Sequence, residues 1–303
     1  MRQKRFHADQ ERLTAKTFLV PALFLAPFLI GLIIFTVYPF INVLLISFKE
    51  DYCLANQTFS GIGFKNYADV IADPYFRSGL RNTSLYVVFV VPIATVLSLF
   101  IATLLNSQVK LKGFFQTCYF LPMVTSITAI GLVWKWLFNF DYGLINYLLS
   151  LFGAKAINWL NNPVYNLPAL IIYGIWSMIP FTTILLLAGL QNVDPQYMTA
   201  AQVDGASTAR IFFRITLPLL APTVGLTLIV NMISASKVFS ELFPLFNGNP
   251  GAAYSLYTVV YYLYDQFFVK WRLDRAAASA VILFLIVLVL TMIQLFIQRK
   301  WEK

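Results

Sequence analysis

The sequence is poor in charged residues, histidine and cysteine. Asp, Glu, Lys and Arg make up 12% of its 303 residues, whereas they make up about 25% of a typical soluble domain. The single histidine, His7, lies in the polar N-terminal tail, and the two cysteines are Cys53 and Cys118. We therefore expect no Cys/His metal site and no histidine-based catalytic centre. The composition also argues against a disulfide scaffold and a disordered chain.

Phosphate-binding motifs are missing as well. No G-x-x-x-x-G-K-[ST] segment occurs, so the chain has no P-loop to cradle ATP. Residues 61–66 begin like a dinucleotide fingerprint but lack its third glycine. We expect no cofactor bound by this chain.

Hydrophobic residues make up 59% of the chain and gather in six uncharged runs. Each run exceeds the roughly 20 residues that cross a bilayer as a helix. The sequence therefore predicts an all-α, polytopic membrane protein with about six transmembrane helices, in which residues 1–16 and 299–303 are tails and 17–298 form the membrane domain. The runs are 17–48, 82–109, 113–134, 156–193, 215–236 and 276–298.

A seventh uncharged stretch, 242–264, is interrupted by Pro244 and by the Asn-Gly-Asn-Pro-Gly segment 247–251. A helix in lipid cannot continue through such a segment without leaving backbone groups unpaired. We expect an outer loop with one short helix here. The first run is too long for a signal peptide, so we expect it to be retained as a span.

The distribution of charge predicts the orientation. Loops 1–16, 106–112, 191–214 and 299–303 carry 12 basic and 5 acidic residues, a net charge of +7. The loops on the other side, 49–81, 135–155 and 247–275, carry 9 basic and 7 acidic residues, a net charge of +2. The positive-inside rule then predicts that both termini are cytoplasmic. Nucleic acid is not an expected partner, because no soluble face gathers the basic residues.

A cytoplasmic elbow is predicted over about 194–218. Asp194 followed by Pro195 is a helix start, and Gly205 suits a helix end. Ser207 can cap a second short helix, which Pro218 would stop. Small residues between these points would let another protein approach closely.

The elbow carries a family resemblance. Residues 200–218, with Asp204-Gly205-Ala206 at their centre, resemble the EAA motif of ABC importer permeases, and the preceding LAGLQ segment 187–191 resembles that of the sugar branch (maltose, glycerol-phosphate and multiple-sugar permeases). The motif's leading Glu is Thr199 here, which leaves that position without a carboxylate. Further similar segments are 63–67, Asn82-Thr83, Leu121-Pro122 with Trp134, 143–146, 236–239 and 247–250, while Asp274-Arg275 replaces a customary Gly-Tyr.

The resemblance implies a permease subunit of a binding-protein-dependent ABC importer in a bacterial or archaeal cytoplasmic membrane. Its implied partners are a second homologous permease, ATP-binding cassette ATPase subunits that bind the ATP, a solute-binding protein outside, and a sugar or oligosaccharide substrate. The elbow would be the helix that docks into the ATPase; the alternative role for Arg210 is contact with lipid phosphates. The implied coupling residues are Thr199, Ala200, Ala201, Asp204, Gly205, Ala206 and Arg210.

Polar residues near the fifth span are candidates for the substrate path. Lys237 and Glu241 are spaced i, i+4, and charges inside a membrane are costly enough to indicate function by default. The alternative is a structural ion pair, with Lys237 snorkelling to the interface. Asn231 and Ser234 fall within two turns of Lys237 and can share a face with it.

Two other functions compete with this interpretation. An ion-coupled secondary transporter of a small polar solute would need no ATPase, and it would be expected to carry more intramembrane carboxylates than Glu241 alone. An intramembrane enzyme would need an acid/base or metal constellation, which one tail histidine cannot supply.

Overall fold

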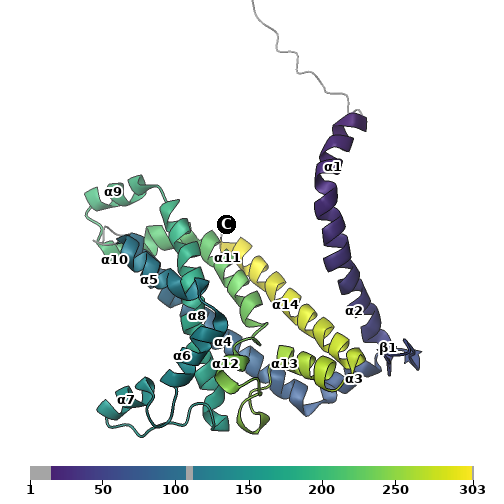
Figure 1. The fold of residues 1–303 in the computed structure, drawn as a ribbon. Helices are drawn as coiled ribbons and strands as arrows, with labels where there is room; N and C mark the ends of the chain where they lie inside the picture. The colour runs from purple at the N-terminus through teal and green to yellow at the C-terminus, as the bar shows by residue number, and fades with distance from the viewer. Residues whose placement is uncertain (1–14, 107–111, 302–303) are drawn as a thin grey trace, which may run out of the picture.

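The structure, a computed structural model, describes residues 15–106 and 112–301, and in this part of the chain nearly all regular structure is helical (Figure 1). The strands β1 (Lys49–Glu50) and β2 (Gly61–Ile62) form one small antiparallel ribbon. Most of the predicted N-terminal tail and the end of the C-terminal tail lie outside the described residues. The helices are α1 (Ala15–Leu32), η1 (Ile33–Val37), α2 (Tyr38–Phe48), α3 (Lys65–Ala72), α4 (Pro74–Asn106), α5 (Lys112–Val124), α6 (Ile127–Leu137), α7 (Leu144–Leu151), α8 (Pro163–Gln191), α9 (Pro195–Val203), α10 (Thr208–Ile211), η2 (Phe212–Thr216), α11 (Leu217–Ala235), α12 (Leu242–Phe246), η3 (Ala252–Tyr254), α13 (Val259–Tyr264), η4 (Asp265–Val269) and α14 (Leu273–Trp301).

Five helical segments are long and apolar enough to cross a membrane, and they match five of the six predicted spans. They are Pro21–Phe48, Pro74–Asn106, Pro163–Gln191, Thr208–Ala235 and Leu273–Lys300. Helix α4 starts at Pro74, well before the uncharged run that begins at 82, because the polar first turns of the helix stand outside the apolar stretch.

The third predicted span is not one continuous helix. Helices α5 and α6 follow each other along it and are separated at Ser126, whose backbone is extended (φ −56°, ψ 132°). The Thr125 hydroxyl donates to the Leu121 carbonyl at 2.7 Å, which satisfies one of the acceptors left at the helix end. The prediction that the run 113–134 forms one transmembrane helix is therefore wrong.

The core lies between α4 and α8. Val90 and Ala94 of α4 are fully buried, as are Ala169 and Leu170 of α8. Gly174 permits this close approach, because a Cβ at that position would collide with the Tyr86 ring. Helix α11 packs against both helices and completes the bundle.

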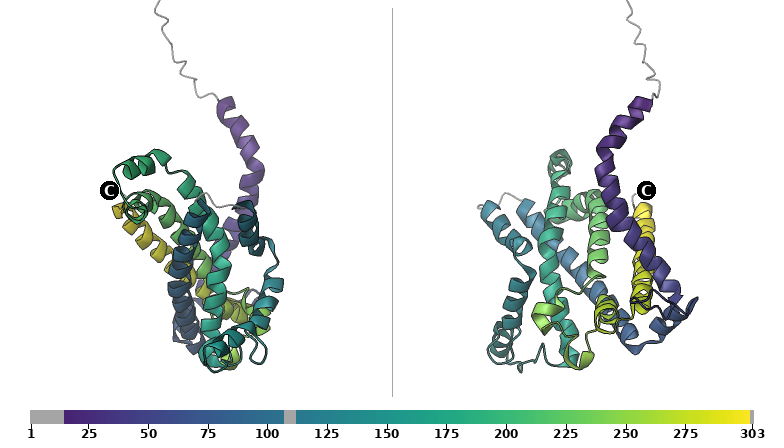
Figure 2. Two further views of the ribbon diagram at one scale, coloured as in Figure 1. Left: turned by 90° about the vertical axis from the view of Figure 1, so that its left-hand side faces the viewer. Right: turned by 45° about the vertical axis from the view of Figure 1, so that its right-hand side comes forward.

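Helix α1 stands away from the bundle in Figure 1, and its N-terminal end projects beyond the bundle in both views of Figure 2. None of the most apolar part of Pro21–Phe48 is buried. Only its continuation, α2, lies along α14, where the rings of Phe40 and Phe284 meet with centroids 5.3 Å apart. A large apolar surface on α1 is therefore left without a protein partner within the described chain.

The interrupted run 242–264 forms two short helices, α12 and α13, where one was predicted. Several of its apolar side chains are packed into the core: Leu242, Leu256 and Tyr262 are fully buried. The Tyr262 hydroxyl donates to Asp73 at 3.0 Å, and burial together with this carboxylate raises the pKa of Tyr262. This segment lies with α3, α7 and β1 at the end of the molecule opposite α9 and the C-terminal end of α14 (Figure 1).

Candidate coupling surface and translocation path

The elbow begins with the predicted cap. The Asp194 carboxylate accepts a hydrogen bond from the Gln196 amide at 2.9 Å, and Pro195 occupies the first turn of α9. Ser207 caps α10 by accepting from the Arg210 amide at 3.4 Å. These two predictions are confirmed.

Gly205 joins the two helices in a left-handed conformation with φ +74°. No heavy atom lies within 4 Å of the position where a Cβ would stand. The positive φ therefore favours glycine here, and no atom of residues 15–106 or 112–301 occupies the space that a side chain at this position would need.

The second helix of the elbow differs from the prediction. Pro218 does not stop it, because α10, η2 and α11 run on as one membrane-length segment, Thr208–Ala235. Pro218 falls at the beginning of α11, and the π-helical turn η2 just before it removes the requirement for the regular hydrogen bond that proline lacks. The elbow is one short helix and a turn that leads directly into the span.

Most of the predicted coupling residues are exposed. Ala206 is half-buried and Ala201 is buried, and the Ala206 amide donates to the Ala201 carbonyl at 3.0 Å. Apolar side chains stand beside them: Val203 is 83% exposed and Tyr197 is 58% exposed. A tip with exposed apolar groups is typical of a surface that another protein covers. The exposed predicted residues are Thr199, Ala200, Asp204, Gly205 and Arg210.

Three of the four predicted path residues line one cavity of about 260 Å³ among α4, α8 and the end of α11. They are Asn231, Ser234 and Glu241, and Ser234 is exposed to it. The sequence prediction missed Tyr86, Ser177 and Phe181 on the facing walls. Gly174, which lines the same cavity, is the sequence feature that could have indicated the close approach of α8 to α4 at Tyr86.

The Asn231 amide is engaged between helices. Its Nδ2 donates to Thr182 Oγ1 at 3.0 Å and lies 3.5 Å from Thr95 Oγ1, so it joins α11 to α8 and α4. The side chain is only 2% exposed. The geometry therefore gives Asn231 a helix-joining contact that the sequence prediction had not included.

Lys237 and Glu241 do not form the i, i+4 ion pair that was the structural alternative to a role in the path. Helix α11 ends at Ala235, so neither residue lies on its face. The Glu241 carboxylate turns back to accept from the Phe239 amide at 3.1 Å, and no ion pair joins it to Lys237. Lys237 is exposed and does not line the cavity.

Asparagines in the motif-like segments hold backbone together. Asn66 donates to the carbonyls of Ser47 and Lys49 at 3.0 and 2.8 Å, which fixes the end of α2 to α3. Asn82 donates to the carbonyls of Ser255 and Tyr257, both at 2.8 Å. These amides satisfy buried carbonyls where the chain is irregular.

Comparisons with known proteins agree with this architecture. Residues 94–303 match the family model described as binding-protein-dependent transport system inner membrane component. The chain therefore belongs to that family: it is a multi-pass permease of an ABC importer in the cytoplasmic membrane, a transporter subunit and not an enzyme.

The similar proteins include carbohydrate transport permeases. The chain is 31% identical to the arabinooligosaccharides permease of Bacillus subtilis, covering 93% of this chain and 89% of the relative, and 31% identical to the trehalose/maltose permease of Thermococcus litoralis, covering 91% and 92%. A crystal structure of a bacterial importer of the acidic polysaccharide alginate matches with a TM-score of 0.78 at 25% identity, over 95% of this chain and 97% of that one. The predicted resemblance to the sugar branch is confirmed.

Proposed function

We propose that this chain forms half of a translocation path for a sugar or oligosaccharide and couples it to ATP hydrolysis by a separate ATPase subunit. The observation that carries the coupling role is the exposed elbow: α9 projects from one end of the bundle (Figure 1), and Gly205 and the first two residues of α10 are exposed. The turn after α9 leads directly into the membrane-length segment Thr208–Ala235, so a displacement of α9 by the ATPase would be transmitted to that span.

The sugar substrate is supported by the relatives and by the chemistry of the cavity. Relatives at about 31% identity over most of the chain carry arabinooligosaccharides or trehalose and maltose. Ser234, Ser177 and Tyr86 bring hydroxyl groups to the cavity, and Phe181 brings an aromatic ring. Hydroxyl groups and rings suit a neutral polyhydroxylated solute. In this proposal Ser234, Asn231 and Glu241 border the path, and Lys237 lies near its outer end.

The partners follow from surfaces that this chain leaves uncovered. In the proposal the ATPase covers Thr199, Ala200, Asp204, Gly205 and Arg210 and binds the ATP. A second permease covers the apolar surface of α1 and completes the path. A solute-binding protein delivers substrate to the opposite end, as a related alginate importer has been crystallised with a pentasaccharide-bound periplasmic protein. Family membership argues against the ion-coupled alternative.

Affinity capture tests the assembly. The chain, tagged at its C-terminus, is purified from native membranes in mild detergent, and the co-purified proteins are identified and quantified. The proposal expects one further permease of the same family and an ATPase in stoichiometric amounts. Isolation of a homo-oligomer without an ATPase would contradict it.

A further inference from the structure

A second cavity, of about 330 Å³, lies at the end of the molecule opposite the elbow, between the end of α6, the loops before and after α7, and the loop after α12. Its volume is within the range of small-molecule pockets, about 300–1,000 Å³. It shares no lining residue with the cavity among α4, α8 and α11. Its most frequent polar lining residue is asparagine: Asn139, Asn158, Asn161, Asn247 and Asn249.

Buried hydrogen bonds hold the walls in place. Asn146 donates to the carbonyls of Phe140 and Ile157 at 3.1 and 2.9 Å and accepts from the Trp159 indole at 3.0 Å, so it ties the two loops around α7 together. On the far wall the Tyr261 hydroxyl donates to the Gly248 carbonyl at 2.9 Å. The cavity is therefore preformed by the fold.

Some lining groups are engaged and others are available. Lys135 Nζ donates to Asn247 Oδ1 at 2.6 Å, and the Asn158 side chain accepts from the Asn161 amide N–H at 3.1 Å. The side chains of Asp141, Asn161 and Asn249 make no hydrogen bond within residues 15–106 and 112–301. These three exposed groups are free to bind a ligand.

The chemistry of the free groups indicates the ligand class. Each amide offers a donor and an acceptor side by side, which matches neighbouring hydroxyls of a sugar ring. Lys135 and Asp141 bring one charge of each sign, so the cavity does not select an anion or a cation. Phe138 and Phe246 form an apolar floor, and the half-exposed ring of Phe140 at the rim can contact the C–H face of a sugar.

We infer that this cavity is an outer subsite that binds one or two units of a neutral saccharide before it enters the membrane path. The inference rests on the proposed sugar transport and adds a contact site outside the spans. Because the cavity is concave, preformed and polar, it suits a small ligand better than it suits the flat surface of a protein partner.

Protection from chemical labelling tests the subsite. Ala252→Cys, at a half-buried lining residue to which no ligand contact is assigned, is introduced into a Cys53→Ser, Cys118→Ser chain, and the assembled complex without its binding protein is labelled in proteoliposomes with a membrane-impermeant maleimide. Maltotriose, arabinotriose and raffinose are the probes, and sugar uptake by the same complex with its binding protein is measured in parallel. Asn56→Cys, an exposed asparagine in the loop before α3, is the matched control.

The sugar that the complex transports is expected to slow labelling of Ala252→Cys at least about threefold and to leave Asn56→Cys unchanged. Adding Asn161→Ala should raise the sugar concentration needed for protection about tenfold, because one or two hydrogen bonds are lost. A transported sugar that gives no protection, or protection that requires the binding protein, would overturn the subsite and leave sugar transport standing. ATP-driven uptake of a non-sugar solute with no sugar uptake would contradict the proposed function itself.

Discussion

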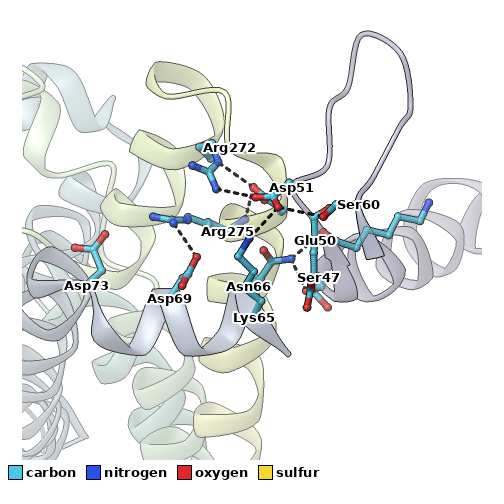
Figure 3. A network of polar contacts seen from close by, with 12 residues as sticks. Ser47, Glu50, Asp51, Ser60, Lys65, Asn66, Asp69, Asp73, Arg272 and Arg275 are labelled. Atoms are coloured by element: carbon cyan, nitrogen blue, oxygen red, sulfur yellow. Dashed lines mark hydrogen bonds and ion pairs between the residues drawn. The ribbon is translucent and has the colours of Figure 1, made fainter. Parts of the chain in front are cut away.

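Arg275, at the start of α14, reaches across to Asp69 on α3, and its Nη2 lies 2.8 Å from Asp69 Oδ2 (Figure 3). These residues are 206 positions apart in the sequence. Arg275 is the second residue of Asp274-Arg275, which replaces the Gly-Tyr that is customary at this position in the permeases that the sequence resembles. Nearby, the Lys65 ammonium is 2.8 Å from Asp51, and this hydrogen bond holds the pKa of the Asp51 carboxyl below its usual value. The network fastens the loop before α3 to the last span.

Reversing the charge at position 275 should loosen this connection. Arg275→Asp places two carboxylates together, and since both side chains are about a quarter to a third exposed, we expect a loss of about 1 kcal/mol. That corresponds to a drop in Tm of about 2–4 °C. The exchange Asp69→Arg with Arg275→Asp should recover most of the loss in thermal unfolding of the purified protein. An equal Tm for single and double variants would show that the pair contributes nothing.

The charge asymmetry of +7 against +2 predicts the orientation in the membrane. Reporter fusions at residue 108 and after Glu302 should be cytoplasmic, although both positions lie outside the described residues. Fusions at residues 60 and 152 should be external. Figure 1 places β1 and α7 at the end opposite α9, so a cytoplasmic reporter at residue 60 would put α9 on the outer side and contradict its docking to an ATPase.

Ser234 is the most direct test of the membrane path. Its hydroxyl is exposed at the cavity among α4, α8 and α11, so Ser234→Leu should reduce sugar uptake at least about tenfold without changing the amount of assembled complex. Ser84→Leu, at an exposed serine of α4 outside the cavity, is the matched control. Asn231→Leu should reduce both sugar uptake and the amount of assembled complex, because it breaks the hydrogen bond to Thr182 that joins α11 to α8. Normal uptake in Ser234→Leu would remove this cavity from the path.

Gly205→Asp tests the coupling surface. The variant should insert and pair with the second permease, while ATPase association per inserted permease falls at least about tenfold, because the new side chain stands in the space that the partner would occupy. Gly153→Asp is a close control: Gly153 also has φ +74° and open space around its Cβ position, but it follows α7 at the opposite end. Equal ATPase association for the two variants would refute docking at Gly205.

Local chemistry in the sequence was sufficient for the elbow. An Asp-Pro start, a glycine at positive φ and a serine cap act within a few residues, so their geometry could be predicted without knowledge of the fold. The prediction that Pro218 stops the second helix was wrong because the π-helical turn η2 accommodates the proline. The composition of residues 212–216 carries no clear sign of such a turn.

Long-range contacts could not be predicted in this way. The pairing expected between Lys237 and Glu241 assumed that α11 continues, but the chain leaves the helix at Ala235 to pack α12 into the core. Likewise, only the tertiary structure places Lys135 beside Asn247 in the asparagine-lined cavity, because these residues are 112 positions apart in the sequence.

The energy source for uptake tests the central claim most directly. The chain, its co-purified permease and ATPase are reconstituted in proteoliposomes, and uptake of a labelled trisaccharide is measured with the binding protein outside and ATP inside. The account predicts uptake that needs both ATP and the binding protein and that persists when proton and sodium gradients are collapsed. Uptake driven by an ion gradient without the ATPase would contradict it.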